Sequence, residues 1–90
     1  MGKLRSKQRA TESNLSKIPN QSGAYILHRG SESRYVGSAG AGRLQARIRQ
    51  QLNEKRNITS IQYKTTTSEK EARKVEEQLR DRFNPDQKNI

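Results

Sequence analysis

The sequence contains no cysteine, so its 90 residues can form neither disulfides nor thiolate metal sites such as zinc fingers. This absence is typical of intracellular proteins, and we expect a cytoplasmic, nucleoid-associated location. Aromatic residues make up only 4% of the chain and hydrophobic residues 28%, which indicates a thin core with little room for a deep ligand pocket. A single domain of this length buries only about 60% of the surface of its unfolded chain.

Long apolar runs are also missing, so we expect no membrane-spanning segment and no signal peptide. Acidic residues are scarce: nine Asp and Glu stand against nineteen Lys and Arg, for a net charge of +10. This balance favours a polyanionic partner, most simply nucleic acid. A ribosome-like or non-specific basic protein is the alternative. An anionic membrane fits less well, because no helix pairs a basic face with a large apolar one.

The N-terminal segment is polar throughout. Apolar side chains are too sparse in residues 1–14 to pack, so we predict a disordered basic arm there and a single folded domain over 15–90. The arm is either simply solvated or contacts phosphates, and Lys17, just beyond it, is a candidate nucleic-acid-binding residue. We expect a monomer that is either a stand-alone minimal domain or a fragment of a larger protein.

Two β-prone runs, Ala24–Arg29 and Arg34–Gly37, flank the turn signal Gly30-Ser31 and predict a β-hairpin. Tyr25 and Tyr35 can share a site only if they project from the same face of the sheet. A three-residue loop would place them directly opposite each other, whereas a tight two-residue turn would place them on opposite faces. The only histidine, His28, is expected to be an exposed strand-end residue, with a role in proton transfer as the alternative.

The segment Gly37–Gly42 has the GxxxxG spacing of a phosphate-binding loop, but Arg43-Leu44 follows where Lys and then Ser or Thr should stand. We therefore interpret it as a flexible connection with glycines at positive φ, or as a loop whose backbone N–H groups contact a phosphate. A helix follows over residues 43–53, with one apolar stripe formed by Leu44, Ile48 and Leu52. Arg47 flanks this stripe, and Arg49 projects from the other side.

A third strand is predicted over residues 58–66, where Tyr63 is interpreted as a packing residue. A capping-box pattern starting at Ser68 opens a last helix that ends near Phe83. The fold class is therefore α/β: a small, three-stranded, mainly antiparallel sheet flanked by helices in the order β-β-α-β-α. On the last helix, at about 100° per residue, Glu76 falls within about 60° of the apolar stripe, while Glu77 points away. A carboxylate beside an apolar face needs a partner, which is either a base such as Arg47 or a divalent metal.

Two tyrosine-bearing segments, a helical arginine and a helical glutamate followed by leucine and proline form one spaced set: Gly23-Ala24-Tyr25, Tyr35-Val36-Gly37, Arg47, and Glu76 with Leu79 and Pro85. This set resembles the GIY-YIG nuclease superfamily, whose members include the catalytic domains of excision-repair nucleases and homing endonucleases. The resemblance spans roughly residues 18–85. Two departures are visible: Ala24 stands in place of the isoleucine of Gly-Ile-Tyr, and Gln51 stands where many members have His or Tyr. Members often have an asparagine just after the proline, and Asn89 is a candidate for that role, offset by one.

The resemblance implies a metal-dependent endonuclease that hydrolyses DNA phosphodiester bonds, with Mg²⁺ or Mn²⁺ as the only cofactor and no small-molecule cofactor. Glu76 would be the metal ligand, Tyr25 would act on the attacking water, Tyr35 would bind the phosphate or the water, and Arg47 would neutralise phosphoryl charge. Arg43, Arg47, Arg49 and Lys17 are the candidate DNA-binding residues. The alternative is a non-catalytic nucleic-acid-binding module with the same fold.

Overall fold

The computed structural model describes residues 7–55 and 57–83. In chain order its elements are β1 (Gln8–Arg9), α1 (Glu12–Leu15), β2 (Ser22–Arg29), β3 (Glu32–Ala39), α2 (Leu44–Glu54), β4 (Ser60–Thr66) and α3 (Glu69–Phe83). From β2 onwards the order is β-β-α-β-α, as predicted. None of the helices in the described ranges has the length and apolar character needed to cross a membrane.

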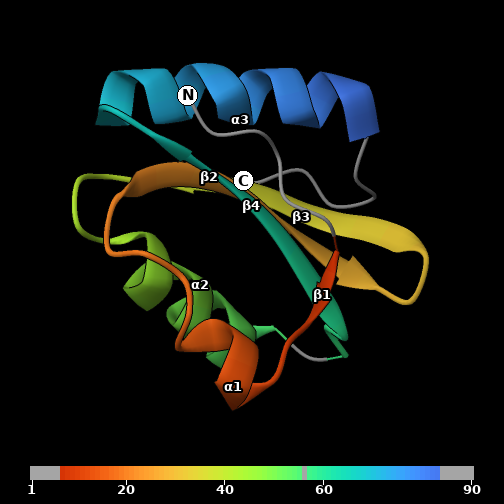
Figure 1. The fold of residues 1–90 in the computed structure, drawn as a ribbon. Helices are drawn as coiled ribbons and strands as arrows, with labels where there is room; N and C mark the ends of the chain where they lie inside the picture. Colours follow the sequence, from red (N-terminus) through yellow and green to blue (C-terminus); the bar gives the residue numbers. More distant parts are fainter. Residues whose placement is uncertain (1–6, 56, 84–90) are drawn as a thin grey trace.

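The sheet has the strand order β1-β4-β2-β3, and all neighbouring strands are antiparallel (Figure 1). Strand β2 is central, and every residue from Ser22 to His28 is buried, because helices cover both faces of this strand. Strand β3 forms one edge of the sheet. The predicted three strands thus make up most of the sheet, and the two-residue β1 extends it beside β4.

The N-terminal part differs from the predicted disordered arm where the structure describes it. Gln8 and Arg9 pair with β4, and the Ala10 backbone N–H donates to Thr59 O at 3.1 Å. Thr11 caps α1 through its side chain, and Leu15 at the end of that helix is buried. A few small apolar contacts and backbone pairing to an open sheet edge therefore order residues 7–14, which composition alone could not reveal. Residues 1–6 lie outside the described ranges.

The sheet separates two layers of helix. Helices α1 and α2 cover one face and α3 covers the other (Figure 1). The stripe of α2 packs with the odd-numbered residues of β2 and β4, a cluster that includes Leu27, Leu44, Ile48, Ile61 and Tyr63. The stripe of α3 packs with the even-numbered residues of β2 and β3, in a cluster of Ala24, Ile26, Val36, Val75 and Leu79. Tyr63 is therefore a packing residue, as predicted.

The register of the β2–β3 hairpin places Tyr25 and Tyr35 on the same face of the sheet. The turn is the tight two-residue one, with Gly30 at φ +60°, and Arg29 pairs with Glu32. A β-bulge follows: His28 pairs with Ser33 but Leu27 pairs with Tyr35, so Arg34 is an extra residue on β3. The bulge shifts the register by one residue. Tyr35 therefore lies on the same face as Tyr25, although a two-residue turn without a bulge would place them on opposite faces.

His28 is not an exposed strand-end residue, because it is only 2% exposed on the α3 face of the sheet. Its Nε2 lies 2.7 Å from Gln62 Oε1, which assigns the proton of the neutral ring to Nε2. Ser33 Oγ lies 3.4 Å from the other ring nitrogen. Burial lowers the pKa of the imidazole, and the nearby Lys7 ammonium acts in the same direction, whereas the bond to Gln62 opposes this shift.

Because His28 is buried and its pKa is lowered, we expect the free energy of unfolding to fall in mild acid. Because the folded-state pKa lies below that of the unfolded chain, the unfolded state takes up the proton first as the pH falls below about 6.5. The free energy of unfolding should then decrease, with a slope of up to about 1.4 kcal/mol per pH unit, until the folded-state pKa is passed. Urea unfolding of wild type and His28→Gln between pH 8 and pH 5 measures this. Equal slopes in the two proteins would contradict the assignment.

Candidate active site

Tyr25 is buried in the middle of β2, and its hydroxyl reaches toward the edge strand β3. The residue opposite it in the register is Gly37, the glycine of Tyr35-Val36-Gly37. A Cβ at this glycine would stand 2.5 Å from Tyr25 Cζ, and it would also collide with the hydroxyl. The missing side chain therefore leaves the space through which the tyrosine ring crosses β3.

Replacing Gly37 by alanine should consequently displace the Tyr25 ring. Overpacking of this kind typically lowers stability by about 1–3 kcal/mol. Gly40→Ala is the matched control, because a Cβ there meets only the flexible end of Glu69, at 3.0 Å. Thermal unfolding and near-ultraviolet circular dichroism of the tyrosines compare the two variants. A Gly37→Ala protein that is as stable as Gly40→Ala, with an unchanged tyrosine spectrum, would show that this glycine is not needed.

The electrostatic surroundings of Tyr25 come from both helical layers. Burial raises the pKa of its hydroxyl, and the Glu76 and Glu54 carboxylates add to that rise. The Arg47 guanidinium, which hydrogen-bonds the hydroxyl, opposes the rise. Because burial is the largest effect, the hydroxyl keeps its proton at neutral pH. It can donate a hydrogen bond to a water or a phosphate but is a poor proton acceptor.

Tyr35 is half-buried on the same face, two residues along β3 from Gly37. The Lys55 ammonium, at the end of α2, lies 4.4 Å from the centre of the Tyr35 ring. A cation above a tyrosine face is attracted by the ring quadrupole and restricts the ring. Lys55 was not singled out by sequence patterns, because its contact depends on where α2 ends relative to β3.

Arg47 and Arg43 lie beside a recess at the β3 edge. This recess, of about 330 Å³, lies between the end of β3 and the first turns of α2, and Ser38, Gly40, Arg43, Arg47 and Gln50 are among the residues that line it. Arg47 is exposed, and its Nη1 donates to Gln50 Oε1 at 3.2 Å. One wall of the recess therefore carries two guanidinium groups that can bind an anion.

Glu76 reaches the same edge from the other face of the sheet. Its carboxylate Oε1 accepts a 2.5 Å hydrogen bond from Ser38 Oγ on β3, and Oε2 accepts from the guanidinium of Arg80 on α3. Its side chain is 13% exposed, whereas Glu77 is exposed, so the helical periodicity distinguished the two acids correctly. The basic partner is Arg80 rather than Arg47. Ser38, which also lines the recess, links the carboxylate to it.

Three of the four predicted catalytic residues lie near one another across an edge strand: Tyr25 and Arg47 on the α2 face of β3, and Glu76 on its α3 face. Tyr35 lies on the α2 face, two residues along β3 from Gly37, and contacts Lys55. Tyr25 and Glu76 are close enough for the carboxylate to raise the pKa of the hydroxyl. The Tyr25 ring can lie across β3 in this way because Gly37 has no side chain.

Two of the candidate DNA-binding residues lie away from the recess. Arg49 forms a two-point ion pair with Glu12 of α1, with nitrogen–oxygen distances of 2.8 and 2.6 Å. This arginine therefore helps to dock α1 on α2. Lys17 is exposed just after α1. Gln51, at the position where many GIY-YIG proteins have His or Tyr, is buried, and Asn89 lies outside the described residues.

The fold is similar to that of the GIY-YIG N-terminal endonuclease domain of UvrC from Thermotoga maritima bound to its catalytic divalent cation, magnesium. The TM-score is 0.67 at 23% sequence identity, over 81% of this chain and 89% of that chain. A point mutant of the same domain, bound to its catalytic divalent cation, matches with the same TM-score and identity over 81% and 88% of the two chains. The chain has the GIY-YIG endonuclease-domain fold. No protein-family model and no curated protein matches the sequence.

The side chains at the edge of this GIY-YIG fold fit a divalent cation held by one protein ligand. Glu76 is a carboxylate beside a hydroxyl, and Mg²⁺ commonly binds one or two carboxylates while waters and phosphate oxygens complete its octahedron. Within the described ranges, no three His, Cys, Asp or Glu side chains gather into a site made of protein ligands alone. The donor set therefore suits a hard cation most of whose ligands are not protein side chains.

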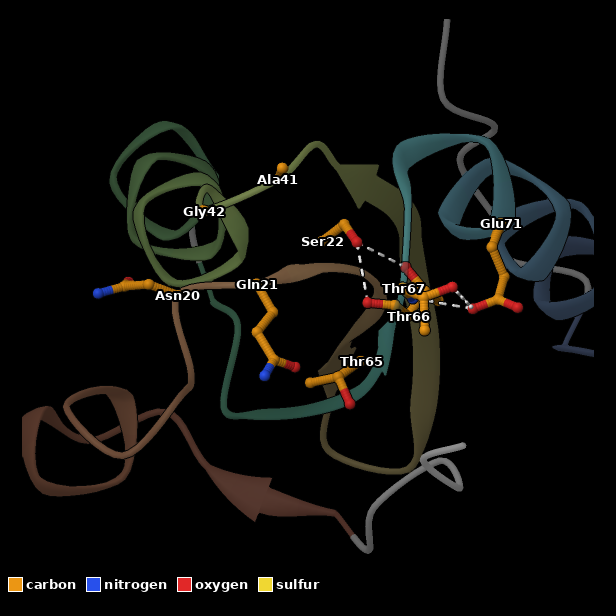
Figure 2. Close-up of a pocket in the computed structure, with 9 residues that line it drawn as sticks. All are labelled: Asn20, Gln21, Ser22, Ala41, Gly42, Thr65, Thr66, Thr67 and Glu71. Carbon is orange, nitrogen blue, oxygen red and sulfur yellow. Dashed lines mark hydrogen bonds between the residues drawn. The ribbon is translucent and has the colours of Figure 1, made fainter.

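A larger cavity of the GIY-YIG fold, of about 570 Å³, contains none of the predicted site residues (Figure 2). It lies where β2 begins and β4 ends, and its polar lining includes Gln21, Thr65 and Glu71. Much of this polarity is already paired: Ser22 Oγ donates to Thr66 O at 2.9 Å, and Glu71 accepts from the Thr67 backbone N–H at 2.9 Å.

Proposed function

We propose that this protein is a divalent-metal-dependent endonuclease that hydrolyses DNA phosphodiester bonds. The observation that carries this proposal is that two arginines line the recess at the β3 edge, that Ser38 of the same recess donates to the Glu76 carboxylate, and that Arg47 and Glu76 both influence the Tyr25 hydroxyl. The fold supports it, because the similar domain of UvrC is an endonuclease domain bound to catalytic magnesium. The net charge of +10 supports a polyanionic substrate.

Arg43 and Arg47 would hold the scissile phosphate in the recess. A guanidinium fork matches two phosphate oxygens, and its charge stabilises the negative charge that grows on them in the transition state. Arg47 is better placed than Arg43 for this second role, because it also contacts the hydroxyl of Tyr25. Tyr35, held by Lys55, would donate a hydrogen bond to the phosphate or to the attacking water.

Tyr25 would orient the attacking water rather than deprotonate it. Its pKa is raised by burial, so a protonated hydroxyl is the form available at neutral pH. Glu76 would hold the divalent cation, Mg²⁺ or Mn²⁺, which when bound supplies a Lewis acid that polarises the phosphate. Hydrolysis places the hydroxyl of the water on phosphorus, breaks one bridging P–O bond and leaves the proton with the departing oxygen.

The proposal is tested by incubating the protein with plasmid, branched and single-stranded DNA, with and without Mg²⁺. We expect cleavage that requires the metal and is absent from a Tyr25→Phe variant. DNA binding without cleavage under all these conditions would instead support the non-catalytic binding module. The absence of any DNA or RNA binding at low salt would contradict both.

A further inference from the structure

Each oxygen of the Glu76 carboxylate already accepts a hydrogen bond from another side chain. Arg80 lies one helical turn further along α3, and its guanidinium contacts Glu76 Oε2, while Ser38 Oγ donates to Oε1. The Glu76 side chain is 13% exposed and that of Arg80 is 32% exposed. The pair is thus partly shielded from water. Solvent and salt therefore screen the attraction between the two charges less than they would at the surface.

A second pair on the same helix shows how different this environment is. Arg73 and Glu69 have the same four-residue spacing and a nitrogen–oxygen distance of 2.7 Å, but their side chains are 72% and 55% exposed. Exposed pairs of this kind contribute little to stability or ligand affinity. Arg80 also has a buried Nε for which no described residue provides an acceptor. Glu76 is therefore the group that compensates the Arg80 charge, and Arg80 compensates that of Glu76.

We propose that Arg80 is an internal counter-cation that competes with the divalent metal for Glu76. This inference rests on the proposed role of Glu76 as metal ligand. A directly bound Mg²⁺ lies about 2.1 Å from a carboxylate oxygen. A guanidinium on that carboxylate occupies one of its oxygens and repels the incoming positive charge. Arg80 thus orients the Glu76 carboxylate before metal binding, and its contact with the carboxylate weakens or breaks when the metal binds.

Direct measurement of metal affinity, without DNA, tests this competition. Free Mn²⁺ is measured by electron paramagnetic resonance at pH 8 for wild type, Arg80→Gln, Arg80→Lys and the matched control Arg73→Gln. We expect Arg80→Gln to lower the Kd for Mn²⁺ at least about tenfold, because a nearby charge of the same sign has been removed. Arg80→Lys keeps the charge and should remain within about threefold of wild type, as should Arg73→Gln.

The thermal stability of the variants and an NMR titration of the wild-type protein are two further tests. Without metal, Arg80→Gln should melt at a lower temperature than Arg73→Gln, and Mn²⁺ should raise its Tm by more than it raises that of wild type. In the wild-type protein, titration with Mg²⁺ should shift the Arg80 Nε–H resonance in nitrogen-15 NMR, while the Arg73 resonance stays in place. This last measurement does not depend on the folding of any variant.

The inference is overturned if folded Arg80→Gln binds Mn²⁺ no more tightly than wild type, if neither protein binds it, or if Mg²⁺ leaves the Arg80 resonance unmoved. Its failure can be told apart from failure of the proposed function. Metal-dependent cleavage by wild type, with an unchanged Kd for Mn²⁺ in Arg80→Gln, would contradict only the proposed competition between Arg80 and the metal. A lower Kd for Mn²⁺ in Arg80→Gln, with no DNA cleavage by wild type, would contradict only the proposed nuclease activity.

Discussion

Glu76→Gln should lose at least about 10³-fold in metal-dependent cleavage, while Glu77→Gln cleaves like wild type. Glutamine keeps the size of the side chain but removes the charge that a hard cation requires, and the cation supplies several kcal/mol of transition-state stabilisation. Glu77 is an equally charged neighbour on the same helix, but it is exposed and points away from β3. Because both residues carry the same carboxylate, a difference between the two variants reports the position of the carboxylate.

The same substitution should also have a measurable structural effect. Arg80 loses its carboxylate partner, so Glu76→Gln should lower the free energy of unfolding by about 1–2 kcal/mol, with the fold retained. DNA affinity should be equal or tighter, because one repulsive charge is gone. Cleavage rate, thermal unfolding and DNA affinity are measured for both variants. A folded Glu76→Gln protein that still cuts DNA with Mg²⁺ would end the metal-ligand assignment.

Arg47→Ala should reduce the cleavage rate by about 10²–10³-fold, or about 3–4 kcal/mol, with a much smaller effect on DNA binding. The reason is that its guanidinium lines the recess and contacts the Tyr25 hydroxyl, where transition-state charge would be stabilised. Because Arg47 is exposed, its truncation should leave the fold intact.

Arg49→Ala is the control for this second prediction. It removes the same charge from the same helix, but Arg49 is bound to Glu12 of α1 rather than to the recess. Its loss should loosen the docking of α1 and lower the Tm slightly, with cleavage near that of wild type at a temperature well below the melting transition. Single-turnover rates and DNA affinities decide the matter. Equal rate losses in the two variants would make Arg47 merely a part of a basic surface.

Local sequence patterns were sufficient for the order of the elements from β2 onwards and for the identity of several side chains on their faces. The four-residue recurrence of Leu44 and Ile48 on α2 predicted which side of that helix is buried, and the structure buries both residues. Likewise, a helix turns by about 100° per residue, so periodicity alone places Glu76 beside the apolar stripe of α3 and points Glu77 away from it. These features depend only on periodicity, which each segment carries by itself.

The register of the hairpin required the folded sheet. The sequence left two turn lengths open, of which the two-residue turn by itself would place Tyr25 and Tyr35 on opposite faces. The structure has that turn, but the bulge at Arg34 places both tyrosines on the same face. No local pattern signals such a bulge, because it forms where cross-strand packing of the whole sheet is best satisfied. The ordering of residues 7–14 has the same origin, since β1 exists only by pairing with β4.

The partners of the site residues were likewise decided by tertiary structure. Sequence periodicity placed Glu76 beside an apolar face and required a compensating group, but it could not choose among Arg47, another base and a divalent metal. The structure assigns Arg80 and Ser38, because α3 packs on one face of β3 while α2, with Arg47, packs on the other. Which charges neutralise one another depends on distances between elements remote in sequence, and those distances exist only once both helices have packed against the sheet.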